Sequence, residues 1–176
     1  MDVIEKLIVI AIITLFPFIE LRGSIPYGVL ANGDIDLFGV ITIPSGPQLD
    51  PLLVFAVAVL ANLAIIPVVM KFLDWFFHIL ENIKIGGFEI GQYFVRRTHR
   101  RAKPFVDKYG TVGLMLFVAI PLPVTGAYTG ALAAHILGMN NKKAMMAIGG
   151  GVIIAGILVT LLVTVLQGLA KYFFLG

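Results

Sequence analysis

Four apolar stretches separated by short polar segments dominate the hydropathy pattern of the chain, and two of them are uninterrupted. Residues 51–73 are apolar apart from Asn62 and Lys71, and residues 142–169 carry no charge after Lys143. A bilayer core about 30 Å thick is crossed by roughly 20 residues of helix. The two uninterrupted stretches therefore predict transmembrane helices.

The other two apolar stretches, residues 3–40 and 111–139, are broken near their middle. The breaking residues are Glu20, Arg22 and Pro26 in the first stretch, and Pro121, Pro123, Thr125 and Gly126 in the second. Because each arm is short for a full crossing, we expect two re-entrant helical hairpins; helices that cross fully and kink at proline are the alternative. Backbone groups at such breaks have no helical partner, so a cavity is expected around them.

The distribution of charge predicts how these segments face the membrane. Residues 71–110 hold eight Lys or Arg, whereas residues 32–50 hold three Asp and no cation. By the positive-inside rule, the 71–110 region and the 140–143 turn are cytoplasmic, and the 32–50 loop is external. The hairpins then enter from opposite sides, each followed by a transmembrane helix. This arrangement is an inverted-topology repeat, which places its substrate site near the middle of the membrane.

The predicted fold is an all-α membrane protein built from these two repeats. The first repeat covers residues 1–73 and the second covers residues 111–176. Between them, residues 74–110 form a basic, amphipathic segment that we expect to contain interfacial helices on the cytoplasmic side.

The composition is typical of a membrane protein and excludes several kinds of functional site. Of the 176 residues, 59% are hydrophobic and 13% are charged, and the mean hydropathy is +1.00. The absence of cysteine excludes disulfides and thiolate metal sites. The sequence has no phosphate loop, metal-ligand cluster, serine–histidine–acid set or dinucleotide fingerprint, so we expect no enzyme, no cofactor and no metal. Its cations come without a nucleic-acid recognition module, so we expect no nucleic-acid partner.

Glu20 and Arg22 are the strongest candidates for chemistry. A charged side chain inside an apolar region costs about 2.5–3.5 kcal/mol on insertion scales, so it is usually retained for a task. Glu20 is a candidate proton carrier. Arg22 is a candidate contact for an anionic head group, most naturally a phosphate, through its planar fork of donors. The alternative is a pair at the membrane interface whose side chains reach water.

The prolines and the second break offer backbone rather than side-chain chemistry. Pro26, Pro121 and Pro123 interrupt helices. Thr125 and Gly126 are placed to begin the outgoing helix, whose N-terminal N–H groups and dipole favour an anion.

Three single polar side chains complete the candidate set. Tyr128 is a candidate polar contact close to the second break. Asn62 is a weaker candidate, because an asparagine inside a span more typically makes an interhelical hydrogen bond than contacts a substrate. His135 is a candidate proton relay, although a lone histidine near a membrane boundary is more often structural.

Two runs of the sequence resemble a known family. They are Glu20-Leu-Arg-Gly-Ser-Ile-Pro-Tyr-Gly28 and, after the basic stretch, Pro121-Leu-Pro-Val-Thr-Gly-Ala-Tyr-Thr-Gly-Ala131. Together they resemble the small multi-drug export proteins, which we take to be related to the DedA or VTT-domain membrane proteins. The resemblance implies two opposed re-entrant hairpins, dependence on proton-motive force, and movement of polyprenyl-phosphate carriers or phospholipids between leaflets. It implies a functional acidic residue at Glu20.

The chain departs from the DedA pattern at the second hairpin. There the family usually has arginines on either side of the break, and the corresponding positions hold approximately Val118 and Val124. Phosphate binding by the second hairpin therefore loses support, and Arg22 is left as the cation at membrane depth.

The sequence thus predicts a proton-coupled membrane transporter for a lipid-linked or amphipathic anion, such as a polyprenyl phosphate or a phospholipid. The alternatives are a small multidrug exporter, in which Glu20 contacts a cationic substrate, and a non-transporting scaffold that binds partners through glycine and alanine faces. The expected partners are membrane lipids, protons, the amphipathic substrate and a second copy of the chain in a homodimer. The expected location is the plasma or inner membrane, in a multi-pass topology.

Overall fold

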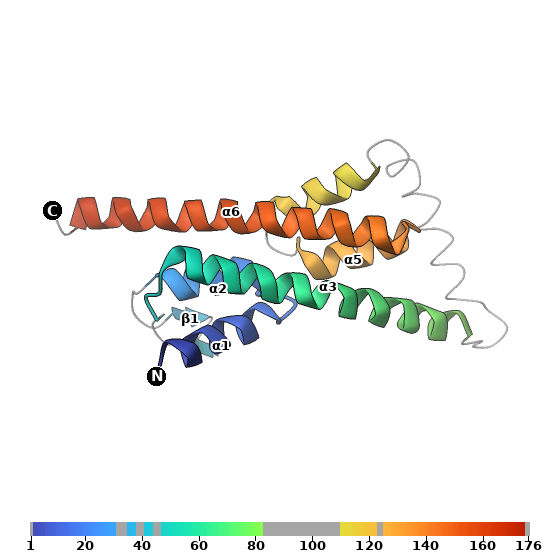
Figure 1. Ribbon diagram of the computed structural model, residues 1–176, viewed down its shortest axis with the longest axis horizontal. Coiled ribbons are helices and arrows are strands. Elements are labelled where there is room, and N and C mark those ends of the chain that lie inside the picture. The colour runs from blue at the N-terminus through green and yellow to red at the C-terminus, as the bar shows by residue number, and fades with distance from the viewer. Residues whose placement is uncertain are drawn as a thin grey trace. The chain divides into compact units, whose positions relative to one another are not determined.

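The structure is a computed structural model that describes residues 2–30, 35–37, 41–43, 47–82, 110–122 and 125–174. Within these residues the chain forms helices and one pair of short strands (Figure 1). The helices are α1 (Val3–Thr14), α2 (Glu20–Val29), α3 (Pro51–Asn82), the 110–119 helix (Gly110–Ala119), α5 (Ala127–Ile136) and α6 (Asn141–Phe174). Most of the predicted cytoplasmic segment, with its basic cluster, lies outside the described residues.

The two long apolar helices that the sequence predicts are α3 and α6. They contain 32 and 34 residues, and each includes an apolar span of 29 residues, long enough to cross a bilayer core. Asp50 caps the start of α3, because its carboxylate accepts hydrogen bonds from the N–H groups of Leu52 and Leu53 at 2.9 and 3.1 Å. α3 runs past the predicted end at residue 73 to Asn82, since neither proline nor glycine lies between.

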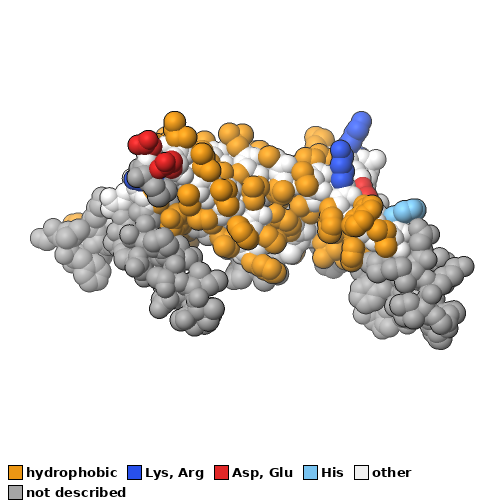
Figure 2. Space-filling model, turned by 90° about the horizontal axis from the view of Figure 1, so that it is seen from below, with side chains coloured by type: hydrophobic (Ala, Val, Ile, Leu, Met, Phe, Trp, Pro, Cys, Tyr) orange, Lys and Arg blue, Asp and Glu red, His pale blue; other side chains and the backbone are white. Residues whose placement is uncertain are grey.

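The outer surface of α3 and α6 is apolar. In each helix, 28% of an 18-residue apolar segment is buried inside the protein. Exposed large hydrophobic side chains include Leu60, Val68, Leu161, Leu162 and Val165. On the face drawn in Figure 2, hydrophobic side chains predominate and charged ones are few. Because a core helix of a soluble protein is mostly buried, this surface is the one expected of helices in contact with lipid.

The chain packs as two compact units, and the first contains Met1–Asn62 and Ile153–Gly176. In this unit α1 and α2 run in opposite directions (Figure 1). Gly28 of α2 lies against both neighbouring helices: a Cβ there would lie 2.7 Å from Val54 Cγ1 and 3.0 Å from Ile10 Cδ1. Packed carbon atoms sit about 3.5–4.0 Å apart, so this close approach requires a glycine.

The second unit is Leu63–Val152, and glycines set its packing as well. A Cβ at Gly151 of α6 would lie 2.6 Å from the carbonyl oxygen of Met115 in the 110–119 helix. A Cβ at Gly130 of α5 would lie 2.6 Å from a valine methyl of that same helix. Both glycines therefore allow close backbone approach inside this unit.

The first broken stretch breaks earlier than the sequence prediction placed it. α1 ends at Thr14, the turn covers residues 15–19, and α2 begins at Glu20. Pro17 in that turn interrupts the incoming helix, because proline has no N–H to donate. Pro26 instead lies inside α2, which continues to Val29. α1 and α2 have 12 and 10 residues, each well short of the roughly 20 that cross a bilayer core.

A short antiparallel strand pair follows α2, where the sequence analysis expected the end of the first hairpin and an external loop. β1 (Ile35–Leu37) and β2 (Ile41–Ile43) pair in the register Ile35 to Ile43 and Leu37 to Ile41. The all-α class thus describes the helices but misses this pair. Three residues are too few for an alternating pattern to be distinguished from a loop.

Candidate functional site

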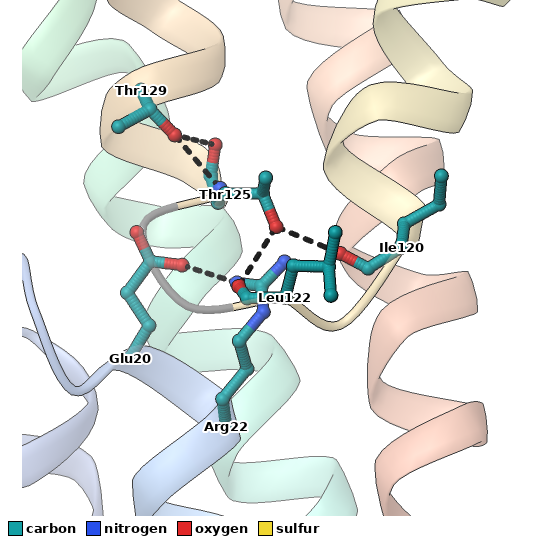
Figure 3. A network of polar contacts seen from close by, with 7 residues as sticks. Glu20, Arg22, Ile120, Leu122, Thr125 and Thr129 are labelled. Carbon is teal, nitrogen blue, oxygen red and sulfur yellow. Dashed lines mark hydrogen bonds and ion pairs between the residues drawn. The ribbon is translucent and has the colours of Figure 1, made fainter.

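Glu20 and Arg22 form a buried ion pair at the start of α2 (Figure 3). Arg22 Nη1 donates a hydrogen bond to Glu20 Oε2 at 3.0 Å, and the two side chains are 15% and 5% exposed respectively. Side chains two residues apart on a regular helix do not face each other. Glu20, however, has a φ of +48°, so its side chain departs from the helical direction and meets Arg22.

The backbone of Glu20 is itself unusual. A left-handed conformation at a residue other than glycine costs of order 1–3 kcal/mol, and it persists where the surroundings impose it. Such residues cluster at functional sites, which motivates a functional hypothesis for Glu20 beyond its burial. Pro26 adds to the irregularity, since it has no N–H to donate to the carbonyl of Arg22 one helical turn earlier.

Among the described residues, the buried polar and charged side chains are four in number, and all belong to the first unit. They are Thr14, Glu20, Ser24 and Asn62. Thr14 Oγ1 lies 2.7 Å from the carbonyl oxygen of Ile10 and 2.6 Å from Ser24 Oγ. With Thr14 donating to that carbonyl, the Ser24 hydroxyl donates to Thr14. The two hydroxyls thus join α1 to α2.

Thr14 and Ser24 are not among the site residues predicted from the sequence. The available signal was weak: one hydroxyl inside an apolar run, and another four residues after Glu20, on the same face of a helix. The two hydroxyls come together only because the turn at residues 15–19 packs α1 against α2.

Asn62 does not make the interhelical hydrogen bond that the sequence analysis favoured. Its side chain is fully buried, and within the described chain neither Nδ2 nor Oδ1 has a hydrogen-bond partner. Val54 and Ala58, which precede Asn62 on the same face of α3, are apolar.

Two threonines hold the second break (Figure 3). Thr125 Oγ1 lies 2.7 Å from the carbonyl oxygen of Ile120 and 2.9 Å from that of Leu122, so its hydroxyl donates to the segment that follows the 110–119 helix. The N–H of Gly126 donates to Thr129 Oγ1 at 2.8 Å. α5 begins directly after Gly126, as the sequence predicts. Because Thr129 occupies the N–H of Gly126, this group is less available to an anion than expected.

The other residues predicted for the second break are Pro121, Tyr128 and Pro123. Pro121 is exposed and Tyr128 lies half-buried on the first turn of α5. Pro123 lies outside the described residues.

His135 lies in a network of the second unit. Its Nδ1 is 3.1 Å from Asp74 Oδ1, and its ring stacks on Phe77 with centroids 4.4 Å apart. Asn141 Nδ2 donates to the other carboxylate oxygen of Asp74 at 2.8 Å. These contacts tie the end of α5 to α3 and to the start of α6, which favours the structural interpretation of His135 over proton relay.

Residues 20–158 of the chain match a family model described as "Putative small multi-drug export protein". The chain belongs to this family. The match begins at Glu20 and extends into α6, so it includes the ion pair, Asn62 and the second break. No curated protein and no solved structure matches the chain.

Family membership and the two long apolar helices together identify a membrane protein from a family described by export. A transport role therefore fits better than catalysis. The predicted relation to the DedA or VTT-domain proteins stays a prediction.

The small-residue face of α5, on which the scaffold alternative depends, is used internally. Ala127, Gly130, Ala131 and Ala134 are buried within the second unit.

Proposed function

We propose that the protein is a proton-coupled membrane transporter of amphipathic molecules with an anionic head group, such as a polyprenyl phosphate or a phospholipid, and that Glu20 and Arg22 carry the coupling. The observation that supports this is the buried ion pair, held by a left-handed residue at the start of a helix too short to cross a membrane. The role of Glu20 is to bind the proton, and that of Arg22 is to bind the anion.

The pair couples the two ligands by competition for one guanidinium. While Glu20 is charged, its carboxylate occupies Arg22. A proton on Glu20 cancels that charge and releases Arg22 for an anionic head group. Loss of the proton restores the ion pair and expels the anion. Because the anion binds the protonated form better, linkage requires that the proton also binds better when the anion is present.

This linkage fixes the direction of transport. Proton and anion bind together, so they cross together. With an inward proton-motive force, an anionic head group moves from the outer side of the membrane to the cytoplasmic side.

The topology that accompanies the proposal follows the charge pattern. The α1–α2 hairpin enters from the outside, the second hairpin enters from the inside, and the region 71–110 is cytoplasmic. The membrane is the plasma or inner membrane, and the functional unit is a homodimer.

The family description favours a second candidate, the export of small drug-like molecules. A cationic molecule would bind the carboxylate of Glu20 and so compete with the proton. Competing ligands exchange, so the cation leaves as protons enter. The two candidates therefore differ in the sign of coupling, with anions moving along the proton flow and cations moving against it.

Proteoliposomes with an imposed pH gradient test both. The probes are a short-chain fluorescent phosphatidic acid and tetraphenylphosphonium. We expect the phosphatidic acid to accumulate in the leaflet toward which protons flow, and Glu20→Gln to remove the effect of the gradient. Glu5→Gln is the matched control, because Glu5 is an exposed glutamate of α1 in the same unit. Accumulation of tetraphenylphosphonium against the proton flow would select the second candidate. Rates independent of the gradient in the unmodified protein would refute coupling altogether.

A further inference from the structure

Asn62 is a buried amide with unused hydrogen-bonding capacity. A side-chain amide offers two donors and one acceptor, and those of Asn62 have no partner within the described chain. Burying a polar amide without hydrogen bonds costs roughly 2–7 kcal/mol, depending on the reference state. Such a group is normally met by another protein group, an ordered water or a ligand.

The helix register places Asn62 at the same height along the helices as the ion pair. Val54, Ala58 and Asn62 are spaced four residues apart and all fully buried, so they form one face of α3. That face starts against Gly28, which packs on Val54. Glu20 precedes Gly28 by eight residues in α2. Asn62 follows Val54 by eight residues in α3.

Eight residues rise about 12 Å along a helix. α2 ends, and α3 begins, at the same level, because the N–H of Leu49 donates to the carbonyl of Gly28 at 3.0 Å. The two helices therefore run in opposite directions from this point. Asn62 and Glu20 lie at the same level.

With α3 crossing the bilayer from Pro51, this level is also deep in the membrane. Asn62 is about 17 Å along α3 from Pro51, at 1.5 Å per residue, which is close to the centre of a bilayer core about 30 Å thick. Water is scarce at that depth, and the buried hydroxyls of Thr14 and Ser24 bond to each other.

We infer that Asn62 binds the transported head group directly, together with Arg22, and selects head groups that carry an O–H beside an anionic oxygen. This rests on the proposed function. Arg22 supplies donors only, so it recognises any oxyanion. Asn62 Nδ2 adds a donor, whereas its Oδ1 is an acceptor and is satisfied only by a ligand that brings a proton. The monoanion of a phosphate monoester has both groups on one phosphorus, and a sulfate monoester lacks the O–H.

A binding assay on the purified protein tests this without transport. Ligand-induced shifts of the melting temperature are measured at pH 5.5 with monohexyl phosphate and with hexyl sulfate. At that pH the phosphate is mostly the monoanion, since its second pKa is about 6. We expect the unmodified protein to bind the phosphate about 10-fold or more tightly than the sulfate, because a buried acceptor left unpaired is costly. Inorganic phosphate is measured in the same assay. A shift with monohexyl phosphate but not with inorganic phosphate shows that the site requires the apolar tail as well as the anion.

Asn62→Leu and Asn62→Asp are the informative variants. Leucine has a similar size and no polar atom, so without ligand it should raise the melting temperature while removing the preference for phosphate over sulfate. Aspartate keeps the shape but replaces the donor by a second acceptor, and should weaken binding of both probes. Thr160→Val is the matched control, because among the described residues of this unit Thr160 Oγ1 is the other buried side-chain oxygen without a hydrogen-bond partner, and it belongs to α6. It should leave the preference unchanged.

Two results would overturn the inference. One is an equal preference for phosphate over sulfate in the unmodified protein and in Asn62→Leu, which would make Asn62 a structural residue that hydrogen-bonds to water. The other is the absence of any phosphate shift in the unmodified protein. Binding that depends on Asn62 but is not accompanied by transport would leave the inference standing and refute the proposed function.

Discussion

The ion pair of Glu20 and Arg22 leads to a prediction about stability in which the two partners are not equivalent. Two unit charges about 4 Å apart attract by roughly 4 kcal/mol at an effective dielectric constant of about 20. The nitrogen and oxygen here are 3.0 Å apart, with both side chains mostly buried. Removing one partner of a buried pair costs about 3–5 kcal/mol, because the remaining charge stays buried.

The remaining charge has different options in the two single variants. In Glu20→Gln the guanidinium keeps its charge, since arginine does not lose its proton in proteins. In Arg22→Met the carboxyl group can bind a proton and become neutral. We therefore expect Glu20→Gln to be the more destabilising variant, with a loss of about 3 kcal/mol in the free energy of unfolding. The double variant, Glu20→Gln with Arg22→Met, should be more stable than Glu20→Gln alone.

Thermal unfolding in detergent, followed by fluorescence-detected size exclusion, measures the stability of the two single variants and of the double variant. For chains of 150–250 residues, 1 kcal/mol shifts the melting temperature by about 2–4 °C, so Glu20→Gln should lower it by roughly 6–12 °C. The exposed Glu5→Gln should lower it by less than about 2 °C. Single-variant losses that simply add in the double variant would refute the coupling between Glu20 and Arg22.

The packing and the remaining polar contacts give further expectations for the same assay. Gly151→Ala places a Cβ 2.6 Å from a carbonyl oxygen and should cost about 1–3 kcal/mol, whereas Gly168→Ala on the same helix meets nothing within 4 Å and should be neutral or stabilising; equal effects would contradict the packing. Ser24→Ala removes a 2.6 Å hydroxyl contact with α1 and should cost about 0.6–1.7 kcal/mol. Asp74→Ala should cost more than His135→Phe, because it removes the contacts with both His135 and Asn141, whereas the phenyl ring keeps the stacking on Phe77; the reverse order would contradict this assignment.

The long helices could be predicted from the sequence because their signal is local. An uninterrupted apolar run after Asp50 and Pro51 specifies both the start of α3 and its membrane-crossing length. Its end at Asn82 could not be placed, because the chain past residue 73 stays helical while changing from an apolar to an amphipathic composition. The loss of hydrophobicity marks where a helix leaves the lipid, and the helix itself continues.

The candidate site was predictable in its charges and not in its geometry. Glu20 and Arg22 stand out because charge is rare in an apolar stretch. The turn that precedes them was missed, because the sequence analysis attributed the break to the charged residues and Pro26 instead of to Pro17. The positive φ of Glu20 has no local sequence signal, since glycine and asparagine are the residues that indicate it.

The neutral polar residues depend on contacts between segments far apart in the chain. Ser24 and Thr14 meet only after the hairpin has closed. Asn62 is at the same level as Glu20 only because Gly28 fixes the register of α2 on α3. Such registers are set by tertiary packing, so a single sequence leaves them open.

The close contacts of the glycines have a consequence for how the protein is made. α1 and α2 are too short to cross the membrane, and the residue on which Gly28 packs, Val54, lies later in the chain. In the second unit, likewise, the 110–119 helix packs on Gly151, which also comes later. Each broken segment therefore leaves the ribosome before its supporting helix exists. The packing of Gly28 on Val54 therefore cannot form until α3 has been synthesised.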